Sequence, residues 1–146
     1  MYPKANNTVD AAVFRNINNI VQVLLIKRRN PPFEDCWAFP GGFVNPDEPL
    51  VVAVKRELKE ETDVDEFLHF TQFKSFGDPG RDPRGWTITT VYFIIVDPKT
   101  EAVAGDDAKE KAWFDVDELP SMAFDHRKIL DNITERFFPF DFCSIG

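Results

Sequence analysis

The chain has 146 residues, 43% of them hydrophobic, which suits one domain over residues 1–146 with a packed core. Its formal net charge of -8 argues against a nucleic-acid partner, because nucleic-acid binding depends on neutralising phosphates. The longest apolar runs, such as residues 91–96, are too short to span a bilayer, and the N-terminus lacks the pattern of a signal peptide. We therefore expect a soluble, cytoplasmic protein with no membrane partner.

The first half of the chain is predicted to run from strands through a loop into a helix. Residues 8–14 and 20–29 have the composition of two strands joined as a hairpin by an Asn-rich turn. Residues 30–42 contain three prolines and two adjacent glycines, which favour a loop. Residues 49–62 carry apolar side chains at spacings of three and four, as an amphipathic helix does, and Pro49 suits its first turn.

The second half is predicted to hold three more strands and a second helix. The strands are expected at residues 67–76, 86–96 and 111–116, with loops between them. The helix is expected to open at Asp125, whose side chain can cap it. This order predicts an α+β fold in which a mixed sheet lies between helices, an α/β/α sandwich.

The two cysteines, Cys36 and Cys143, lie far apart and form no CxxC pair. Two cysteines cannot supply a zinc framework of the usual kind. We expect both to be reduced thiols without a functional role.

Three glutamates gather on one face of the predicted first helix. Because each helical residue turns by about 100°, Glu57, Glu60 and Glu61 project from a single patch. Like charges at this spacing destabilise an isolated helix by roughly a few tenths of a kcal/mol per pair. Hard divalent cations such as Mg2+ take carboxylate oxygens, so the patch can be a metal site. The alternative is a solvated acidic face.

The residues ahead of this helix favour the metal site. Gly41 and Gly42 allow a backbone carbonyl to face a cation without interference from a side chain. Glu48 can orient an arginine or a metal-ligating glutamate. Arg56 can pair with a nearby glutamate and hold the loop to the helix.

This arrangement resembles the Nudix box, GX5EX7REUXEEXGU, in which U is aliphatic. Gly42, Glu48 and residues 56–61 fit the pattern, and Val64 fills the last aliphatic position. Asp63 stands where the family usually has Gly. A Gly there would end the helix in a left-handed conformation, which Asp adopts at some cost.

The resemblance implies the hydrolysis of a nucleoside diphosphate linked to another moiety. It implies that Glu57 and Glu61 are the main metal ligands, with Glu60 contributing, and that the Gly41 carbonyl is a backbone ligand. Arg56, together with Glu48, would be a structural partner in the catalytic set. The expected cofactor is Mg2+, with Mn2+ also possible. Family members are commonly dimers, so we expect a homodimer.

Four other stretches resemble ADP-ribose pyrophosphatases: PPFEDCWAFPGGFV, GRDPRGWTITTVYF, AGDDAKEKAWF and LPSMAFDHRKIL. This likeness implies cleavage of ADP-ribose to AMP and ribose 5-phosphate. One alternative is a Nudix hydrolase of NADH, a nucleoside triphosphate or a dinucleoside polyphosphate. Another is an ADP-ribose-sensing regulator. Regulators with a DPRG-type segment carry a winged-helix domain after the Nudix domain, and the sequence up to Gly146 is not expected to hold one.

Candidate substrate-binding residues lie outside the box. Arg81 and Arg84 in the loop at 77–85, and Arg28 or Arg29 at the end of a strand, can clamp phosphates in bidentate fashion. The alternative is that these arginines only pair with carboxylates. Aromatic side chains can stack on adenine or can simply fill the core, and the candidates are Phe33, Trp37 and Trp86.

A catalytic base is expected from the acidic loop at residues 105–110. Glu110 is the first candidate for a base or a further metal ligand, and Asp107 is the second. Either acid can instead be solvated. His126 belongs to the last of the four resembling stretches, but the sequence supplies no physical role for it.

Overall fold

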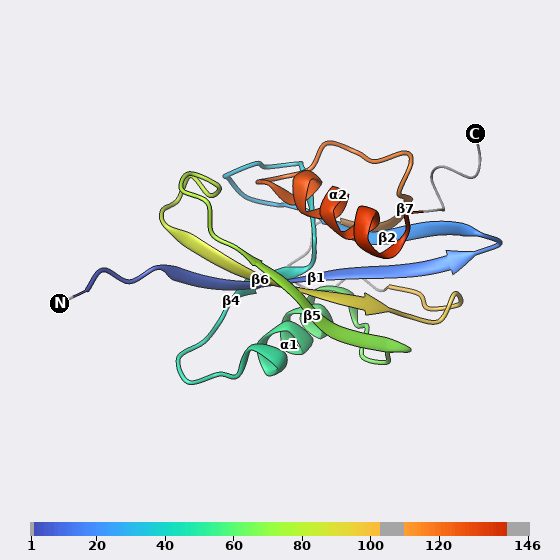
Figure 1. Cartoon of the computed structure of the whole chain (residues 1–146), viewed down its shortest axis with the longest axis horizontal. Coiled ribbons are helices and arrows are strands. Elements are labelled where there is room, and N and C mark those ends of the chain that lie inside the picture. The colour runs from blue at the N-terminus through green and yellow to red at the C-terminus, as the bar shows by residue number, and fades with distance from the viewer. Residues whose placement is uncertain (1, 103–109, 140–146) are drawn as a thin grey trace.

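In this computed structural model, which describes residues 2–102 and 110–139, seven strands form one sheet with a helix on each face (Figure 1). The strands are β1 (Asn6–Ile17), β2 (Ile20–Lys27), β3 (Trp37–Ala38), β4 (Gly41–Phe43), β5 (His69–Phe76), β6 (Thr87–Ile95) and β7 (Glu110–Asp115). The helices are α1 (Leu50–Thr62) and α2 (His126–Phe137). The predicted α/β/α sandwich is confirmed.

The long strand β1 organises the sheet, whose main order is β3-β2-β1-β6-β5. One edge of β1 pairs in parallel with β6 over residues 6–14. Its other edge is shared, because β2 pairs with residues 14–17 and β4 pairs with residues 8–10. The sheet therefore opens between β2 and β4.

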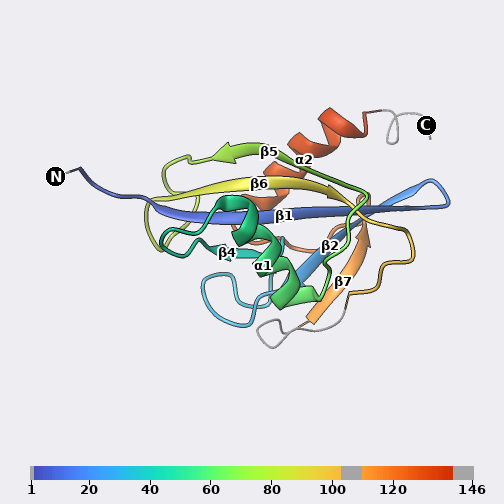
Figure 2. The same ribbon diagram turned by 90° about the horizontal axis from the view of Figure 1, so that it is seen from below.

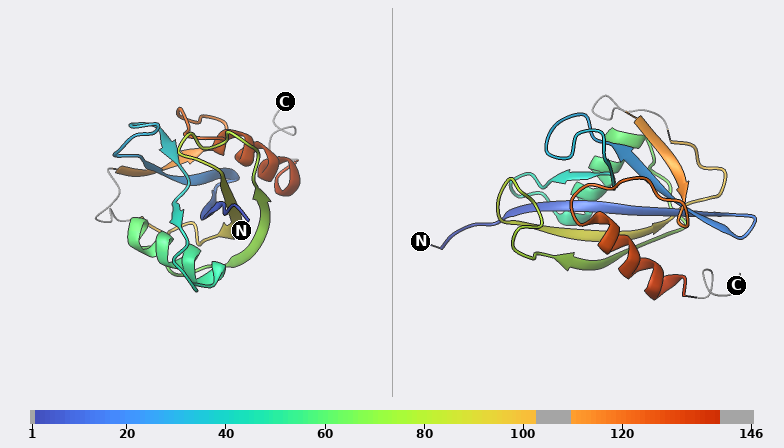
Figure 3. Two further views of the ribbon diagram at one scale, coloured as in Figure 1. Left: turned by 90° about the vertical axis from the view of Figure 1, so that its left-hand side faces the viewer. Right: turned by 90° about the horizontal axis from the view of Figure 1, so that it is seen from above.

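Alternation along β1 divides the core into two layers. Val9, Ala11 and Val13 pack against α1, whereas Ala12 and Phe14 pack against α2. Figures 2 and 3 show the two helices on opposite sides of the sheet. A polar residue at an even position of β1 is thus directed toward the layer of α2.

Two local predictions were wrong. The segment 30–42 is not all loop, because it contains β3 and β4. Strands of two and three residues are too short to show an alternating pattern, and they form because β2 and β1 offer free edges. Asp125 precedes α2 but makes no capping hydrogen bond with its side chain. Its carboxylate is instead paired with Arg81.

Within the described residues, neither helix is long and apolar enough to cross a membrane. Cys36 is a free thiol. Cys143 and Asp107 lie outside the part of the chain that the structure describes.

Asp63 ends α1 in the left-handed conformation that the box pattern assigns to Gly. Its φ and ψ are 64° and 13°, and its N–H donates to the carbonyl of Lys59. Its carboxylate also lies 2.8 Å from the Lys59 ammonium group. Asp therefore fills this position with the geometry expected for Gly.

Replacing Asp63 by Ala should lower the free energy of unfolding by about 1 kcal/mol, because Ala meets the left-handed steric penalty without a short polar side chain to offset it. Asp63→Gly should be more stable than Asp63→Ala by about the same amount, since Gly has no Cβ. Urea unfolding of the three proteins measures the difference. Equal stabilities of the Ala and Gly variants would contradict this account of the helix end.

Candidate active site

A cavity of about 240 Å³ lies where the sheet opens between β2 and β4. Its walls come from β1, the end of β2, β4, the last turn of α1, the loop at 77–85 and the start of α2. It brings acidic and basic side chains together, and its charged and ionisable lining residues are Asp10, Arg28, Glu61, Arg81, Asp82, Arg84 and His126.

Arg56 links the loop before α1 to the acidic face of that helix. Its guanidinium contacts both carboxylate oxygens of Glu48, at 2.7 and 3.0 Å. It also lies 2.8 Å from a carboxylate oxygen of Glu57 and donates to the carbonyl of Phe43 at 3.2 Å. The expected partnership of Arg56 with Glu48 is present, and it ties the end of β4 to α1.

The two glycines of β4 lie against two carboxyl groups of α1. The N–H of Gly41 donates to Oε1 of Glu61 at 2.8 Å. A Cβ atom on Gly42 would lie 2.7 Å from the carboxyl carbon of Glu57. Any larger residue at position 42 would therefore displace that group.

Burial and mutual repulsion make this pair of carboxyl groups a fit for a divalent cation. Burial raises the pKa of Glu61 well above its usual value, and the charges of Glu57 and Asp10 add to the rise. Burial also raises the pKa of Glu57, although Arg56 partly offsets it. Two adjacent carboxyl groups that resist ionisation together would be relieved by a cation between them.

Glu60 lies at the edge of this group. Its side chain is 49% exposed and reaches Arg56 only at 3.4 Å. Among the described residues, no three side chains of Asp, Glu, His or Cys are grouped closely enough to form a metal centre. Mg2+ keeps several waters and binds substrate phosphates, so it can be held by as few as one or two carboxylates such as those of Glu57 and Glu61.

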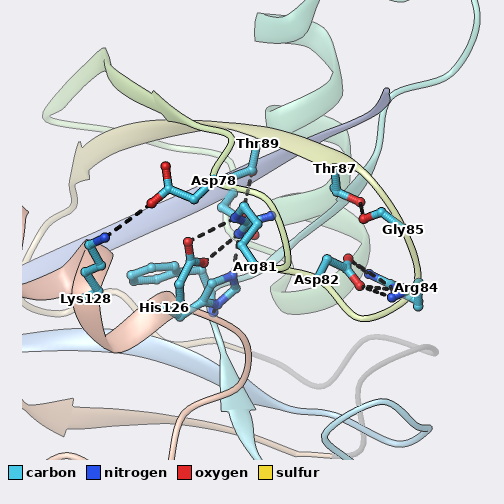
Figure 4. A network of polar contacts seen from close by, with 12 residues as sticks. Asp78, Arg81, Asp82, Arg84, Gly85, Thr87, Thr89, His126 and Lys128 are labelled. Atoms are coloured by element: carbon cyan, nitrogen blue, oxygen red, sulfur yellow. Dashed lines mark hydrogen bonds and ion pairs between the residues drawn. The ribbon is translucent and has the colours of Figure 1, made fainter. Parts of the chain in front are cut away.

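The arginines of the loop at 77–85 face the cavity with carboxylate partners (Figure 4). Arg81 is almost fully buried and makes a bidentate contact with Asp125, at 2.7 and 3.0 Å. Arg84 pairs with the buried Asp82 of its own loop at 2.8 Å. The Arg81–Asp125 pair holds the loop against the start of α2, and both guanidinium groups line the cavity.

Phe124 lies between two of the cavity arginines. Its ring centroid is 4.9 Å from the guanidinium of Arg28 and 5.3 Å from that of Arg84. Burial and the positive charge of Arg84 both lower the pKa of Arg28, so the two cations repel each other. An anionic ligand between them would relieve this repulsion.

The other predicted residues lie further out. Phe33 packs on Phe124 with centroids 5.0 Å apart, but it does not line the cavity. Trp37 packs edge-on against Phe114, and Trp86 is 52% exposed. Glu110 is an exposed residue at the start of β7 and does not line the cavity. Its role as a base stays a prediction.

Three cavity residues were missed by sequence reasoning or left without a role: Asp10, Asp82 and His126. Asp10 is 7% exposed and accepts a hydrogen bond from the Thr89 hydroxyl. The sequence did contain a signal for Asp10, because a charged residue in the middle of an otherwise apolar strand indicates a buried functional group. Asp82 offered no such signal, because acids are common in loops.

These features define an α/β/α protein whose acidic helix and arginine-bearing loop face one cavity. The sequence matches the NUDIX domain over residues 6–137, and the chain belongs to this family.

Three known proteins are particularly similar. The ADP-ribose pyrophosphatase of Methanocaldococcus jannaschii is 47% identical over 113 residues, which cover 75% of this chain and 63% of that protein. The ADPR responsive transcriptional repressor NtrR of Acinetobacter baylyi is 34% identical over 139 residues, which cover 92% of this chain and 55% of the repressor. The chain thus spans less than two thirds of the length of either relative.

The third is a solved structure, the NUDIX domain of Shewanella oneidensis NrtR complexed with ADP ribose. It superposes with a TM-score of 0.85 at 30% identity, and the match covers 92% of this chain and 90% of that one.

The Glu48–Arg56 pair predicts a pH-dependent stability. Hydrogen bonds from Arg56 and from the backbone of Asn45 lower the pKa of Glu48 from 4.5 to about 2. Because the folded pKa is the lower one, the stabilisation is present above about pH 4.5 and is lost as the pH falls toward 2. Glu48→Gln should therefore melt at a lower temperature than the wild type at neutral pH, and the gap should shrink in acid. Thermal unfolding across this range measures it.

Glu66→Gln is the matched control, since Glu66 is exposed and lies outside the box. Its melting temperature should equal that of the wild type at every pH. A gap between wild type and Glu48→Gln that stays constant down to about pH 3 would show that the ion pair is not its source.

Proposed function

We propose that this chain is a divalent-metal-dependent pyrophosphohydrolase that cleaves the diphosphate bond of a nucleoside diphosphate linked to another moiety. The observation that carries the proposal is the carboxyl pair Glu57 and Glu61 set against two glycines, with the arginines Arg28, Arg81 and Arg84 lining the cavity that Glu61 also lines. Opposite charges arranged in this way suit a ligand that carries phosphates and shares a cation with the protein.

In this proposal each group has a separate task. Glu57 and Glu61 hold Mg2+ or Mn2+, with Glu60 and the Gly41 carbonyl as further ligands. The metal supplies polarisation of a phosphoryl oxygen and activation of water. Arg28 and Arg84 orient the diphosphate from the opposite wall, while Arg56 keeps the acidic face of α1 in place. The catalytic base is Glu110, if its strand end approaches the bound substrate.

ADP-ribose is the favoured substrate, with AMP and ribose 5-phosphate as products. Similarity to an ADP-ribose pyrophosphatase and to a NUDIX domain complexed with ADP ribose supports this choice. The aromatic surface of Phe124 and Phe33 beside the arginines offers an apolar face for adenine. A homodimer located in the cytoplasm is part of the same proposal.

A second candidate function is ADP-ribose sensing without turnover. The match to a repressor described as ADPR responsive favours it. The complete set of box carboxylates favours catalysis instead, because a sensor needs only to bind. Turnover distinguishes the two functions, since a sensor would bind ADP-ribose and leave it intact.

Glu61→Gln should lower kcat for ADP-ribose by more than about 100-fold, because even the outer-shell partners of a metal typically contribute 10- to 100-fold. The measurement is cleavage in Mg2+ of ADP-ribose, NADH, a dinucleoside polyphosphate and a nucleoside triphosphate, followed for each by the release of its own nucleotide product. The wild type should cleave ADP-ribose with the highest kcat/KM of this panel.

Glu66→Gln serves as the control and should retain wild-type kcat. Full activity of Glu61→Gln would contradict the metal-ligand role. A higher kcat/KM for another substrate would overturn the choice of ADP-ribose and leave the reaction class standing.

A further inference from the structure

The segment from Phe39 to Gly41 lines the cavity, and both of its backbone N–H groups donate to side chains. Phe39 donates to Nδ1 of His126 at 3.1 Å, and Gly41 donates to Oε1 of Glu61 at 2.8 Å. Pro40, between them, has no N–H to donate. The segment is therefore held at one end by the first residue of α2 and at the other by a residue in the last turn of α1.

Asp10 lies against this segment from β1. It is the register partner of Gly41, and a Cβ on Gly41 would lie 2.6 Å from its Oδ1 atom. Its Oδ2 atom accepts a hydrogen bond from the Thr89 hydroxyl and lies 3.6 Å from Nε2 of His126. Asp10 is only 7% exposed, and its neighbours on the same face of the sheet include the apolar Ala12 and Phe14. Burying a carboxylate there costs free energy, so hydrophobic packing does not account for an Asp at this position.

The hydrogen bond from Phe39 determines which nitrogen of His126 carries the proton. Since Nδ1 accepts, the neutral ring has its hydrogen on Nε2, the nitrogen nearest to Asp10. The histidine is 3% exposed and packs against the rings of Phe39 and Phe124, with centroids 4.8 and 5.4 Å away. The imidazole cannot turn without losing its polar contacts on both sides.

The Asp10 charge also acts on the candidate metal site. Asp10 is the register partner of Gly41, and the Gly41 N–H donates to Glu61, so the Asp10 carboxyl group lies beside the backbone that holds this candidate metal ligand. A carboxylate at this place favours a cation beside Glu61.

We propose that Asp10 and His126 are positioning residues for the metal site. The imidazole holds the Phe39 N–H on one side and the Asp10 carboxylate on the other, so the backbone at Gly41 is fixed between them. The Gly41 N–H then directs the Glu61 carboxylate toward the cavity. This inference rests on the proposed function, because it assigns the pair a part in binding the divalent cation.

Two substitutions of His126 separate its two contacts. His126→Asn places an amide near the former Nδ1, where it still accepts the hydrogen bond from Phe39. His126→Gln extends toward the former Nε2 and leaves that N–H unpaired. Asp10→Asn removes the charge with little change of shape. Ile133→Ala is the matched control, because Ile133 is fully buried on α2 and does not line the cavity.

The readouts on the full chain are the affinity for Mn2+, from the electron paramagnetic resonance of the free ion, and kcat and KM for ADP-ribose. His126→Gln and Asp10→Asn should weaken Mn2+ binding and lower kcat by about 10- to 100-fold, the range typical of outer-shell partners, with little change in KM. His126→Asn, which keeps the hydrogen bond from Phe39 but loses the contact with Asp10, should show a smaller loss of Mn2+ affinity and kcat than His126→Gln. Ile133→Ala should lose melting temperature and keep its Mn2+ affinity and kcat.

Wild-type Mn2+ affinity and kcat in both His126→Gln and Asp10→Asn, with melting temperatures lowered as in Ile133→Ala, would overturn the positioning role. A wild-type protein that binds Mn2+ but leaves ADP-ribose intact would count against the proposed function, and the Mn2+ affinities of the variants would still decide the positioning role. Absence of Mn2+ binding in the wild type would overturn both proposals.

Discussion

The hydrogen bond from the Gly41 N–H to the Glu61 carboxylate is the constraint on which the site depends. It joins the short strand β4 to the last turn of α1, and it brings a second carboxyl group, that of Glu57, over Gly42. A Cβ at position 41 would lie 2.2 Å from the Val9 carbonyl oxygen, so the close approach of β4 to β1 requires glycine there. At Gly42 a Cβ would lie 2.7 Å from the Glu57 carboxyl group, and that side chain would have to move.

The sheet topology determines what else can reach this point. Because β1 gives its edge to β4 at one end and to β2 at the other, a gap opens beside Gly41. The loop at 77–85 and the start of α2 line this gap, and the Arg81–Asp125 pair joins them. The carboxyl groups come mainly from α1 and β1, whereas the guanidinium groups come from β2 and the loop. A ligand that carries phosphates would fit this separation of charge, with the arginines as its partners.

The local part of this arrangement could be predicted from the sequence, and the non-local part could not. The helix, its acidic face and the Glu48–Arg56 partnership follow from residues close together in the chain. Asp10, Thr89 and His126 come from three elements that only the parallel pairing of β1 with β6 and the packing of α2 bring together. Asp125 was expected to cap a helix, but it pairs with Arg81, because a buried guanidinium requires a carboxylate partner.

The effect of Mg2+ on stability tests the central claim, that Glu57 and Glu61 form the cation site, most directly. The wild type should gain about 2.7 kcal/mol of unfolding free energy at an Mg2+ concentration 100 times the dissociation constant. The double variant Glu57→Gln and Glu61→Gln should be at least as stable as the wild type without metal, because the repulsion between the buried Glu61 and the partly buried Glu57 is gone. It should gain nothing from Mg2+. An equal gain in both proteins would contradict the account.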